Sequence, residues 1–351
     1  MRITPLTCTG DARSMGRQYG EARAKELAQA LAGYFAMFAA LPGSPDRAVL
    51  IQAASKLKAP ALAAAPQDMA FMQGQAEGAS IAFNEFFAMQ CFLEVMFNYH
   101  VLPAMCTSFA VTGPATKAGE TLVGQNVDWF LYSSLDLLRL EYPDGSRSLA
   151  LCLLGIPIYQ MTSHGLCNSA NLTVGPPMTA PPVPFAVYLP KAMREPTVEG
   201  AMAVLKNHVQ GLGYFHVADA AGTMLGIESV PGRHVLLRPE NGVLSHANSY
   251  EAPEFKVLDQ GHVIMPDSPL RAARIRERVA QRHGEITVEV MQEIMRDHSG
   301  HPCSICRHPD PAAPELLRSE SLTSVIMAPG RGVMWVTSGP PCENEYQEFQ
   351  L

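Results

Sequence analysis

The chain has 351 residues and a formal net charge of −7, with 47 % hydrophobic and 17 % charged residues. This composition supplies a large core and argues against disorder, and the acidic balance argues against a nucleic-acid partner. No Ser/Gly-rich linker or charge block divides the chain, so we expect one compact unit. The N-terminus lacks a signal-peptide core and no apolar run reaches membrane-spanning length, which predicts a cytoplasmic protein with no membrane partner. The eight scattered cysteines favour reduced thiols over a disulfide framework.

The first third of the chain has the pattern of a helical layer. Apolar residues recur at helical spacing, with Glu, Arg and Lys opposite them, over residues 12–41, 46–64 and 67–98. Pro103 ends this block. We therefore expect residues 1–105 to form a helical N-terminal part that covers a sheet.

From Cys106 onward the pattern becomes strand-like, with turn residues between short apolar runs. Strands are expected at residues 106–113, 121–128, 137–142, 147–154, 167–173, 214–219, 223–229, 233–238, 242–247, 321–327 and 332–337, followed by a polar tail. Helices are expected at residues 185–194, 197–210, from Ser268 as N-cap onward, and 287–297. Runs of strands, two helices and more strands indicate stacked sheets with helices outside.

The arginines of the helix that begins near Ser268 are spread along it, as on an ordinary solvated helix face. We therefore expect no anion site at Arg271, Arg274 or Arg276.

The strands at residues 106–113 and 121–128 form the stretch around which the rest is organised. A Gly/Pro/Lys connection joins them, which is typical of a hairpin. Such a hairpin places a thiol at the start of one strand, Cys106, near a carboxylate at the end of the other, Asp128.

Five short motifs occur in one order over about two thirds of the chain. They are Cys106-Thr107-Ser108, Gly124-Gln125-Asn126-Val127-Asp128-Trp129, Gly165-Leu166 followed by Asn171, His246-Ala247-Asn248, and Ser304-Ile305-Cys306-Arg307-His308. In these motifs the chain resembles the N-terminal nucleophile hydrolases, and within them the acyl-coenzyme A:6-aminopenicillanic-acid acyltransferase family. The resemblance implies an α+β fold, a four-layer αββα sandwich with a helical N-terminal segment.

In that family the precursor cleaves itself just before a Cys. The resemblance implies a cut between Met105 and Cys106, which would leave residues 1–105 and 106–351 as two associated chains within one compact unit. The freed α-amine of Cys106, with an ordinary pKa of about 8, could then take the proton of the Cys106 thiol. Met105 stands where the penicillin-forming enzyme has Gly, and Gly relaxes more readily into a strained backbone. The alternative for Cys106 is an inert buried thiol.

Four further residues have roles implied by the resemblance. Asp128 would orient the α-amine, and Asn248 would donate its side-chain amide to the developing oxyanion. Asn171 would hold the substrate or the amine, and Arg307 would be a charge partner for Asp128. Turn or strand-end roles are the alternative for Asp128 and Asn248. His246 is expected to be structural, because the α-amine makes a separate base unnecessary.

The segment from His298 to His308 has zinc-ligand chemistry, because it combines Cys303-x-x-Cys306 with nearby histidines. All of its ligand types fall within one short stretch and no second pair lies at zinc-finger spacing. We therefore expect no metal and no other cofactor, and zinc binding remains an alternative.

The predicted function is that of a Cys amidohydrolase or acyltransferase that acts on a small-molecule amide or acyl thioester through an acyl-Cys106 intermediate. Hydrolysis is favoured because water needs no dedicated site; the alternative is an acyl-CoA-dependent N-acyltransferase with a small amine as acceptor. A non-catalytic binding protein is a third possibility, which the joint presence of Cys106, Asp128 and Asn248 disfavours. Beyond the pairing of the two cleaved chains, the sequence leaves a homo-oligomer open.

Overall fold

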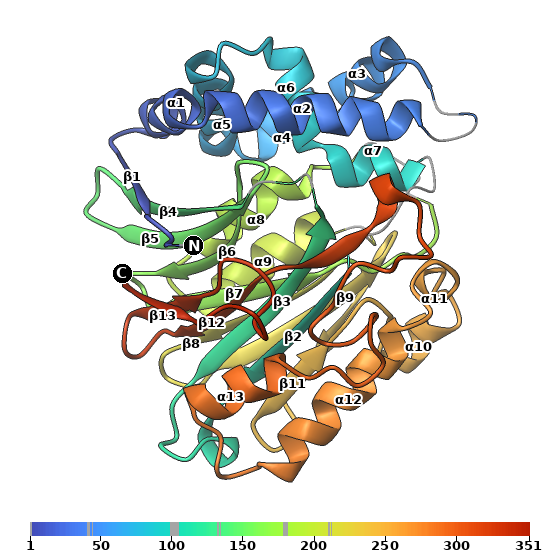
Figure 1. Cartoon of the computed structure of the whole chain (residues 1–351). Helices are drawn as coiled ribbons and strands as arrows, with labels where there is room; N and C mark the ends of the chain where they lie inside the picture. Colours follow the sequence, from blue (N-terminus) through green and yellow to red (C-terminus); the bar gives the residue numbers. More distant parts are fainter. Residues whose placement is uncertain are drawn as a thin grey trace.

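Figure 1 shows the computed structural model, which describes residues 2–40, 43, 45–98, 105–131, 133, 135–177, 182–209, 211 and 213–351. Within these residues two β-sheets pack face to face, and helices cover both outer sides. The predicted α+β class and the αββα layer order are confirmed. Among the described residues, no helix combines the length and the apolar character needed to cross a bilayer.

The larger sheet has eight strands within the described residues, in the order β1-β4-β5-β6-β7-β8-β9-β10. Their bounds are β1 (Leu6–Thr9), β4 (Leu135–Glu141), β5 (Arg147–Leu153), β6 (Ile156–Thr162), β7 (Leu166–Asn171), β8 (Tyr214–Asp219), β9 (Met224–Val230) and β10 (Arg233–Leu237). The pair β1 and β4 is parallel, and the remaining neighbours are antiparallel. Helices α8 (Phe185–Met193) and α9 (Val198–His208) cover its outer face.

The smaller sheet has six strands within the described residues, in the order β11-β2-β3-β12-β13-β14. Their bounds are β11 (Val243–His246), β2 (Met105–Val111), β3 (Leu122–Phe130), β12 (Ser319–Ala328), β13 (Val333–Val336) and β14 (Gln347–Gln350). Helices α12 (Ser268–Gln281) and α13 (Val288–Met295) cover its outer face. Strands β2 and β3 therefore lie between a helix layer and the other sheet, and the burial of residues 106–111 and 122–130 fits that position.

The N-terminal helices form a separate group along one side of the sheets (Figure 1). They are α1 (Ala12–Ala22), α2 (Ala24–Ala39), α3 (Arg47–Ser55), α4 (Lys58–Ala64), α5 (Pro66–Gly78), α6 (Phe83–Gln90) and α7 (Phe92–Asn98). Helices α1 and α5 touch through glycines: a Cβ added to Gly16 would lie 2.0 Å from the carbonyl oxygen of Phe71, and one added to Gly74 would lie 2.1 Å from that of Arg13. Any larger residue would push the two helices apart.

Three strands were not predicted from the sequence. Strand β6 contains Pro157, whose missing N–H argues against a strand, and the structure accommodates it at a register shift in the β5–β6 pairing. Strands β1 and β14 are short and lie outside the apolar pattern, so the N-terminal part is not wholly helical and the tail after residue 337 is not wholly irregular. The short helices α10 (Pro253–Lys256) and α11 (Gly261–Ile264) were also missed. Pro103 lies outside the described residues.

Candidate active site

The predicted hairpin is present, with β2 and β3 paired antiparallel so that Cys106 opposes Val127 and Met105 opposes Asp128. Cys106 lies near the start of β2 and is buried, with 4 % of its surface exposed. Burial and the nearby Asp128 carboxylate raise the pKa of the Cys106 thiol to about 12. The resting thiol is therefore protonated and would need a base to become a nucleophile.

The backbone groups of Cys106 are held by two side chains from distant segments. Its N–H donates to Asn248 Oδ1 at 2.8 Å, and its carbonyl oxygen accepts from an Arg271 guanidinium nitrogen at 2.7 Å. The other terminal nitrogen of Arg271 donates to Asn248 Oδ1 at 2.8 Å. Asn248 and Arg271 thus form one network around the peptide unit of Cys106.

Arg271 was placed wrongly by the sequence analysis. It is not part of a solvated helix face: it is 2 % exposed, and it heads the largest fully buried side chains among the described residues. Its guanidinium also donates to Asp267 Oδ2 at 2.7 Å and to Thr107 Oγ1 at 2.9 Å. The sequence signal that could have revealed it is the spacing of Asp267 and Arg271, one helical turn apart at the start of α12.

The predicted N-cap also differs from the structure. Asp267, not Ser268, is the N-cap of α12. The Ser268 hydroxyl instead accepts from the backbone N–H of Asn248 at 2.7 Å and donates to Ser249 Oγ. The start of α12 therefore holds Asn248 in place.

The side-chain amide of Asn248 points its oxygen, not its nitrogen, at the backbone of Cys106. Its Nδ2 donates to the carbonyl oxygen of Leu172 at 3.0 Å. Two donors on Oδ1 and one acceptor at Nδ2 fix this orientation. In the intact chain Asn248 therefore acts first as an acceptor for the group that would become the α-amine.

Asn171 lies on β7, across the sheet interface from β2. Its Oδ1 accepts from the Ser108 hydroxyl at 2.5 Å. Its Nδ2 is buried and has no hydrogen-bond partner among the described residues, and the side chain lines the cavity that Cys106 also lines. An unpaired buried amide N–H beside the thiol is a donor available to a ligand.

Asp128 is fully buried and opposes Met105 across the hairpin. Its Oδ1 accepts from the Ser321 hydroxyl at 2.6 Å, and its Oδ2 lies 3.8 Å from Arg307 Nε. Burial raises the pKa of this carboxyl to about 7, although Arg307 and Arg271 act in the opposite direction. Asp128 can therefore gain or lose a proton near neutral pH.

Arg307 lies where the sequence analysis placed it, next to Asp128. It also donates to Asp267 Oδ2 at 2.5 Å, so Asp267 is shared between Arg307 and Arg271. Burial tends to raise the pKa of Asp267, but the two arginines together lower it. The resulting chain of charges, Asp128–Arg307–Asp267–Arg271, leads from β3 to the backbone of Cys106.

His246 is engaged elsewhere. Its Nε2 lies 2.8 Å from Glu228 Oε1, its Nδ1 lies 2.6 Å from the carbonyl oxygen of Ala247, and its ring stacks on Tyr214. On β11 it opposes Ser108, not Cys106. The geometry supports a structural role.

A mainly apolar cavity opens beside Cys106. Phe92 and Leu93 of α7, Trp129 of β3 and Phe185 of α8 contribute to its wall, together with residues of β5 to β8. Phe92 packs edge-on against both Trp129 and Phe185. Helix α7 precedes the predicted cut, so the N-terminal part would have to stay bound for this wall to remain complete.

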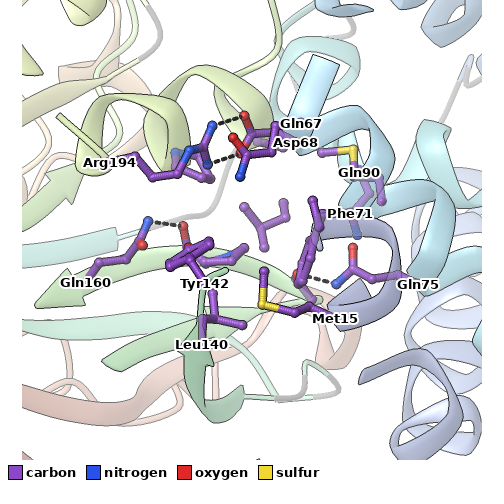
Figure 2. Close-up of a pocket in the computed structure, with 17 residues that line it drawn as sticks. Met15, Gln67, Asp68, Phe71, Gln75, Gln90, Leu140, Tyr142, Gln160 and Arg194 are labelled. Atoms are coloured by element: carbon purple, nitrogen blue, oxygen red, sulfur yellow. Dashed lines mark hydrogen bonds and ion pairs between the residues drawn. The ribbon is translucent and has the colours of Figure 1, made fainter. Parts of the chain in front are cut away.

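A second cavity lies between helices α1, α5 and α8 and the larger sheet (Figure 2). Figure 2 shows Arg194 reaching Asp68. The two terminal guanidinium nitrogens of Arg194 donate to the two carboxylate oxygens of Asp68, at 2.7 and 2.6 Å. None of the predicted site residues lines it. The cavity next to Cys106 is therefore the one that matches the chemistry.

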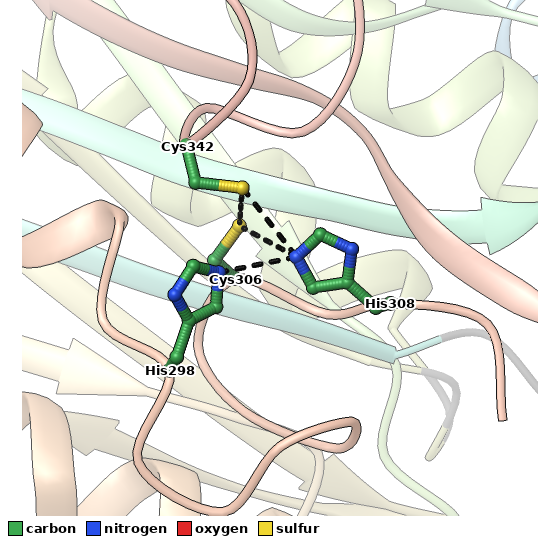
Figure 3. A group of neighbouring side chains, drawn as sticks. All are labelled: His298, Cys306, His308 and Cys342. Atoms are coloured by element: carbon green, nitrogen blue, oxygen red, sulfur yellow. Dashed lines mark hydrogen bonds between the residues drawn. The ribbon is translucent and has the colours of Figure 1, made fainter.

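Away from these two cavities, the structure brings together several of the residues that the sequence analysis considered for zinc. His298, Cys306 and His308 come together with Cys342, which was not considered, whereas Cys303 is absent from the cluster (Figure 3). The Sγ of Cys303 instead accepts from Arg307 at 3.2 Å. The Cys-x-x-Cys pattern therefore misidentified one of the converging thiols.

Comparisons with known proteins find similar solved structures at low identity. A mutant of the conjugated bile acid hydrolase from Clostridium perfringens matches with 14 % identity over 70 % of this chain and 97 % of that chain, at a TM-score of 0.46. The penicillin V acylase from Agrobacterium tumefaciens matches with 15 % identity over 66 % of this chain and 83 % of that chain, at a TM-score of 0.47. No protein-family model and no curated protein sequence matches the chain. At these values the likeness carries no argument about function, so the proposal below rests on the residues.

Proposed function

We propose that the chain is an amide hydrolase in which Cys106 is the nucleophile. The observation that carries the proposal is the arrangement around Cys106: its thiol borders an apolar cavity, Asn248 Oδ1 accepts from its backbone nitrogen, and Asn171 presents a free amide N–H in the same cavity. An inert core thiol would need neither a cavity nor buried polar groups that are only partly paired.

The proposed maturation uses the same groups. Cys106 Sγ attacks the carbonyl carbon of Met105, the C–N bond to Cys106 breaks, and the nitrogen takes up a proton to become an amine. Water then hydrolyses the thioester, which frees the Met105 carboxylate and the thiol. Asp128 opposes Met105 across the hairpin, and its pKa of about 7 suits it to pass a proton to the leaving nitrogen.

In the mature enzyme the α-amine of Cys106 would accept the thiol proton and later deliver it to the leaving amine of the substrate. Asn248 Oδ1 would orient this amine, since it already accepts from the same nitrogen in the intact chain. Asn171 Nδ2 would donate to the oxyanion of the tetrahedral intermediate, together with the second N–H of Asn248 Nδ2, whose first N–H donates to Leu172. Water finally hydrolyses the acyl-Cys106 thioester to a carboxylic acid and the free thiol.

The cavity argues for an apolar acyl group on the substrate. Its wall includes Leu93, Leu153, Ile158, Phe185 and Phe215, and it offers few polar groups beyond those around Cys106. We propose a linear amide whose acyl side is hydrophobic. Transfer of the acyl group from an acyl-CoA to a small amine is the second candidate, because the acyl-Cys106 step is the same in both reactions.

The test combines mass and activity measurements. Intact-mass analysis under denaturing conditions should show two chains, residues 1–105 and 106–351, in wild-type protein. The same protein should release the amine from N-acyl amides with long acyl chains faster than from N-acetyl analogues, and an added amine acceptor should divert part of the product if transfer occurs. If wild-type protein stays at full length and still turns over amides, the α-amine cannot be the base.

A further inference from the structure

Four side chains from three separate segments converge on one point in the C-terminal part (Figure 3). His298 follows α13, Cys306 and His308 precede β12, and Cys342 lies between β13 and β14. One ligand atom from each lies within 4.8 Å of the others. We propose that His298, Cys306, His308 and Cys342 bind one zinc ion.

Four of the six distances between these ligand atoms are close to those of a tetrahedral site. With Zn–S of about 2.3 Å and Zn–N of about 2.05 Å, a tetrahedron separates two sulfurs by about 3.8 Å, two nitrogens by about 3.3 Å and a sulfur from a nitrogen by about 3.6 Å. Cys306 Sγ lies 3.5 Å from Cys342 Sγ, and His298 Nε2 lies 3.1 Å from His308 Nε2. His308 Nε2 lies 3.4 Å from Cys342 Sγ and 3.9 Å from Cys306 Sγ. The ligand atom of His298 lies within 4.8 Å of both sulfurs, so a side-chain rotation of the exposed His298 would bring all four atoms onto one metal ion.

The ligand chemistry selects zinc over the common hard cations. Two thiolates and two imidazoles form a Cys₂His₂ set, which Ca²⁺ and Mg²⁺ avoid because they prefer oxygen ligands. Two thiolates also neutralise the charge of a divalent ion. Glu343 Oε1 lies 3.8 Å from His308 Nδ1, where a carboxylate would orient the ring whose other nitrogen faces the metal.

Four protein ligands make this a closed, structural site with no position for a substrate or for reactive water. Its effect is to tie the C-terminal segment around Cys342 to the segment that precedes β12. A disulfide is a different outcome: the two sulfurs are 3.5 Å apart, whereas an S–S bond needs about 2.05 Å.

The proposed zinc site also connects to the charged residues near Cys106, Asp128 and Asp267, through Arg307, the residue between Cys306 and His308. A metal that holds both neighbours would fix the backbone from which Arg307 reaches Asp267 and Asp128. This consequence for activity rests on the proposed function, whereas zinc binding itself does not.

The experiment is metal analysis of protein made without a polyhistidine tag and purified under reducing conditions. Wild type should hold about one zinc per chain. Reduced, metal-free protein reconstituted with Co²⁺ should show the visible bands of tetrahedral cobalt and a thiolate charge-transfer band in the near ultraviolet. Cys342→Ser and His298→Asn should each lose most of the zinc and most of the cobalt spectrum. His298 is exposed, so its replacement tests the ligand set without disturbing the core.

Cys303→Ser is the matched control, because Cys303 lies in the same segment but contacts Arg307 instead. It should keep the zinc content of wild type. Three outcomes would overturn the proposal: wild type with far less than one zinc and no cobalt bands after reconstitution, a loss of zinc in Cys303→Ser as complete as in Cys342→Ser, or a Cys306–Cys342 disulfide in the reduced preparation. Amide turnover is not part of this readout, so failure here leaves the proposed function standing.

Discussion

Two clusters of sulfur and polar side chains lie on either side of Arg307, and they differ in what surrounds the sulfur. Around Cys106 the neighbours are hydrogen-bonding groups and a carboxylate, and one side opens onto an apolar cavity. Around Cys306 the neighbours are a second thiol and an imidazole nitrogen at ligand distances. A lone thiol beside space for an acyl group suits covalent chemistry, whereas thiols that face other soft donors suit a metal.

The comparison teaches that nearness in sequence does not define a site. Cys306, Arg307 and His308 are consecutive, yet the outer two belong to the zinc cluster and the middle one belongs to the charge chain that reaches Asp128. Consecutive side chains can point to different sides of the backbone, so one short stretch can serve two sites.

The largest expected effect separates the two kinds of cysteine. Cys106→Ala should abolish autocleavage and lower kcat on the order of 10⁶-fold, because the nucleophile and the base are lost together. Cys106→Ser should be cleaved slowly, since a hydroxyl can still attack the preceding carbonyl. Intact mass and amine release measure both effects.

Cys342→Ser is the comparison for that experiment. It should still be cleaved and keep far more turnover than Cys106→Ala, because Cys342 does not line the cavity beside Cys106 and can affect it only through the backbone of Arg307. A similar loss of activity in both variants would break the distinction between a reacting thiol and a ligand thiol.

The next effect concerns the two asparagines near Cys106. Asn248→Ala should lower kcat by about 10²–10³-fold, the effect of one lost oxyanion donor, with KM near wild type; Tm should also fall, because the buried side chain makes three hydrogen bonds. Asn248→Asp should be slower still, because a carboxylate at Oδ1 would keep the α-amine protonated and would face the carbonyl oxygen of Leu172. Measurements of kcat, KM and Tm on the three proteins test this.

Asn171→Ala provides the matched measurement. If Asn171 Nδ2 is the main oxyanion donor, this variant should lose as much kcat as Asn248→Ala but should cleave itself normally, because Asn171 does not contact the Cys106 backbone. A variant at either position that is stable and fully active would remove that residue from the site.

The hairpin of β2 and β3, with Cys106 and Asp128 at one end, could be predicted from the sequence, because strand pattern and turn residues are local signals. The pairing of Arg307 with Asp128 came from the motif order, and the structure places the two side chains 3.8 Å apart. These parts needed no knowledge of how distant segments pack.

Arg271 and Cys342 could not be predicted in the same way. Arg271 lies on a helix with several charged neighbours, and only tertiary packing shows that its side is the buried one. Cys342 lies 36 residues beyond Cys306, in a segment whose position depends on the path of β12 and β13. The orientation of the Asn248 amide likewise depends on Arg271, which the sequence analysis assigned to the surface.

A smaller effect is expected on stability at the zinc cluster. Cys342→Ser should lower Tm by roughly 3–8 °C relative to zinc-loaded wild type, because metal that binds only the folded chain stabilises it. Cys303→Ser should lower it less, and a chelator should lower Tm in wild type but not in Cys342→Ser. Equal Tm values for loaded wild type and Cys342→Ser would show that any bound metal contributes no stability.

The smallest effect is a pH dependence of stability that arises at Asp128, near Cys106. The folded-state pKa of Asp128 is raised to about 7 by burial, above its value of 3.8 in the unfolded chain. Folded protein then binds more protons than unfolded protein between these values, so this group's contribution to stability is full below about pH 4 and is lost as pH rises through about 7. Asp128→Asn, made in the Cys106→Ala background so that both proteins remain single chains, should reduce this loss by about 1–3 kcal/mol.

Glu94 is a second buried carboxyl with a pKa raised to about 7. Glu94→Gln should flatten the dependence of stability on pH separately, because Glu94 accepts from the Phe185 N–H at the contact between α7 and α8. Urea unfolding at pH 5 and pH 8 measures both slopes, and an unchanged slope in Asp128→Asn would mean that Asp128 stays ionised throughout and cannot exchange a proton during maturation.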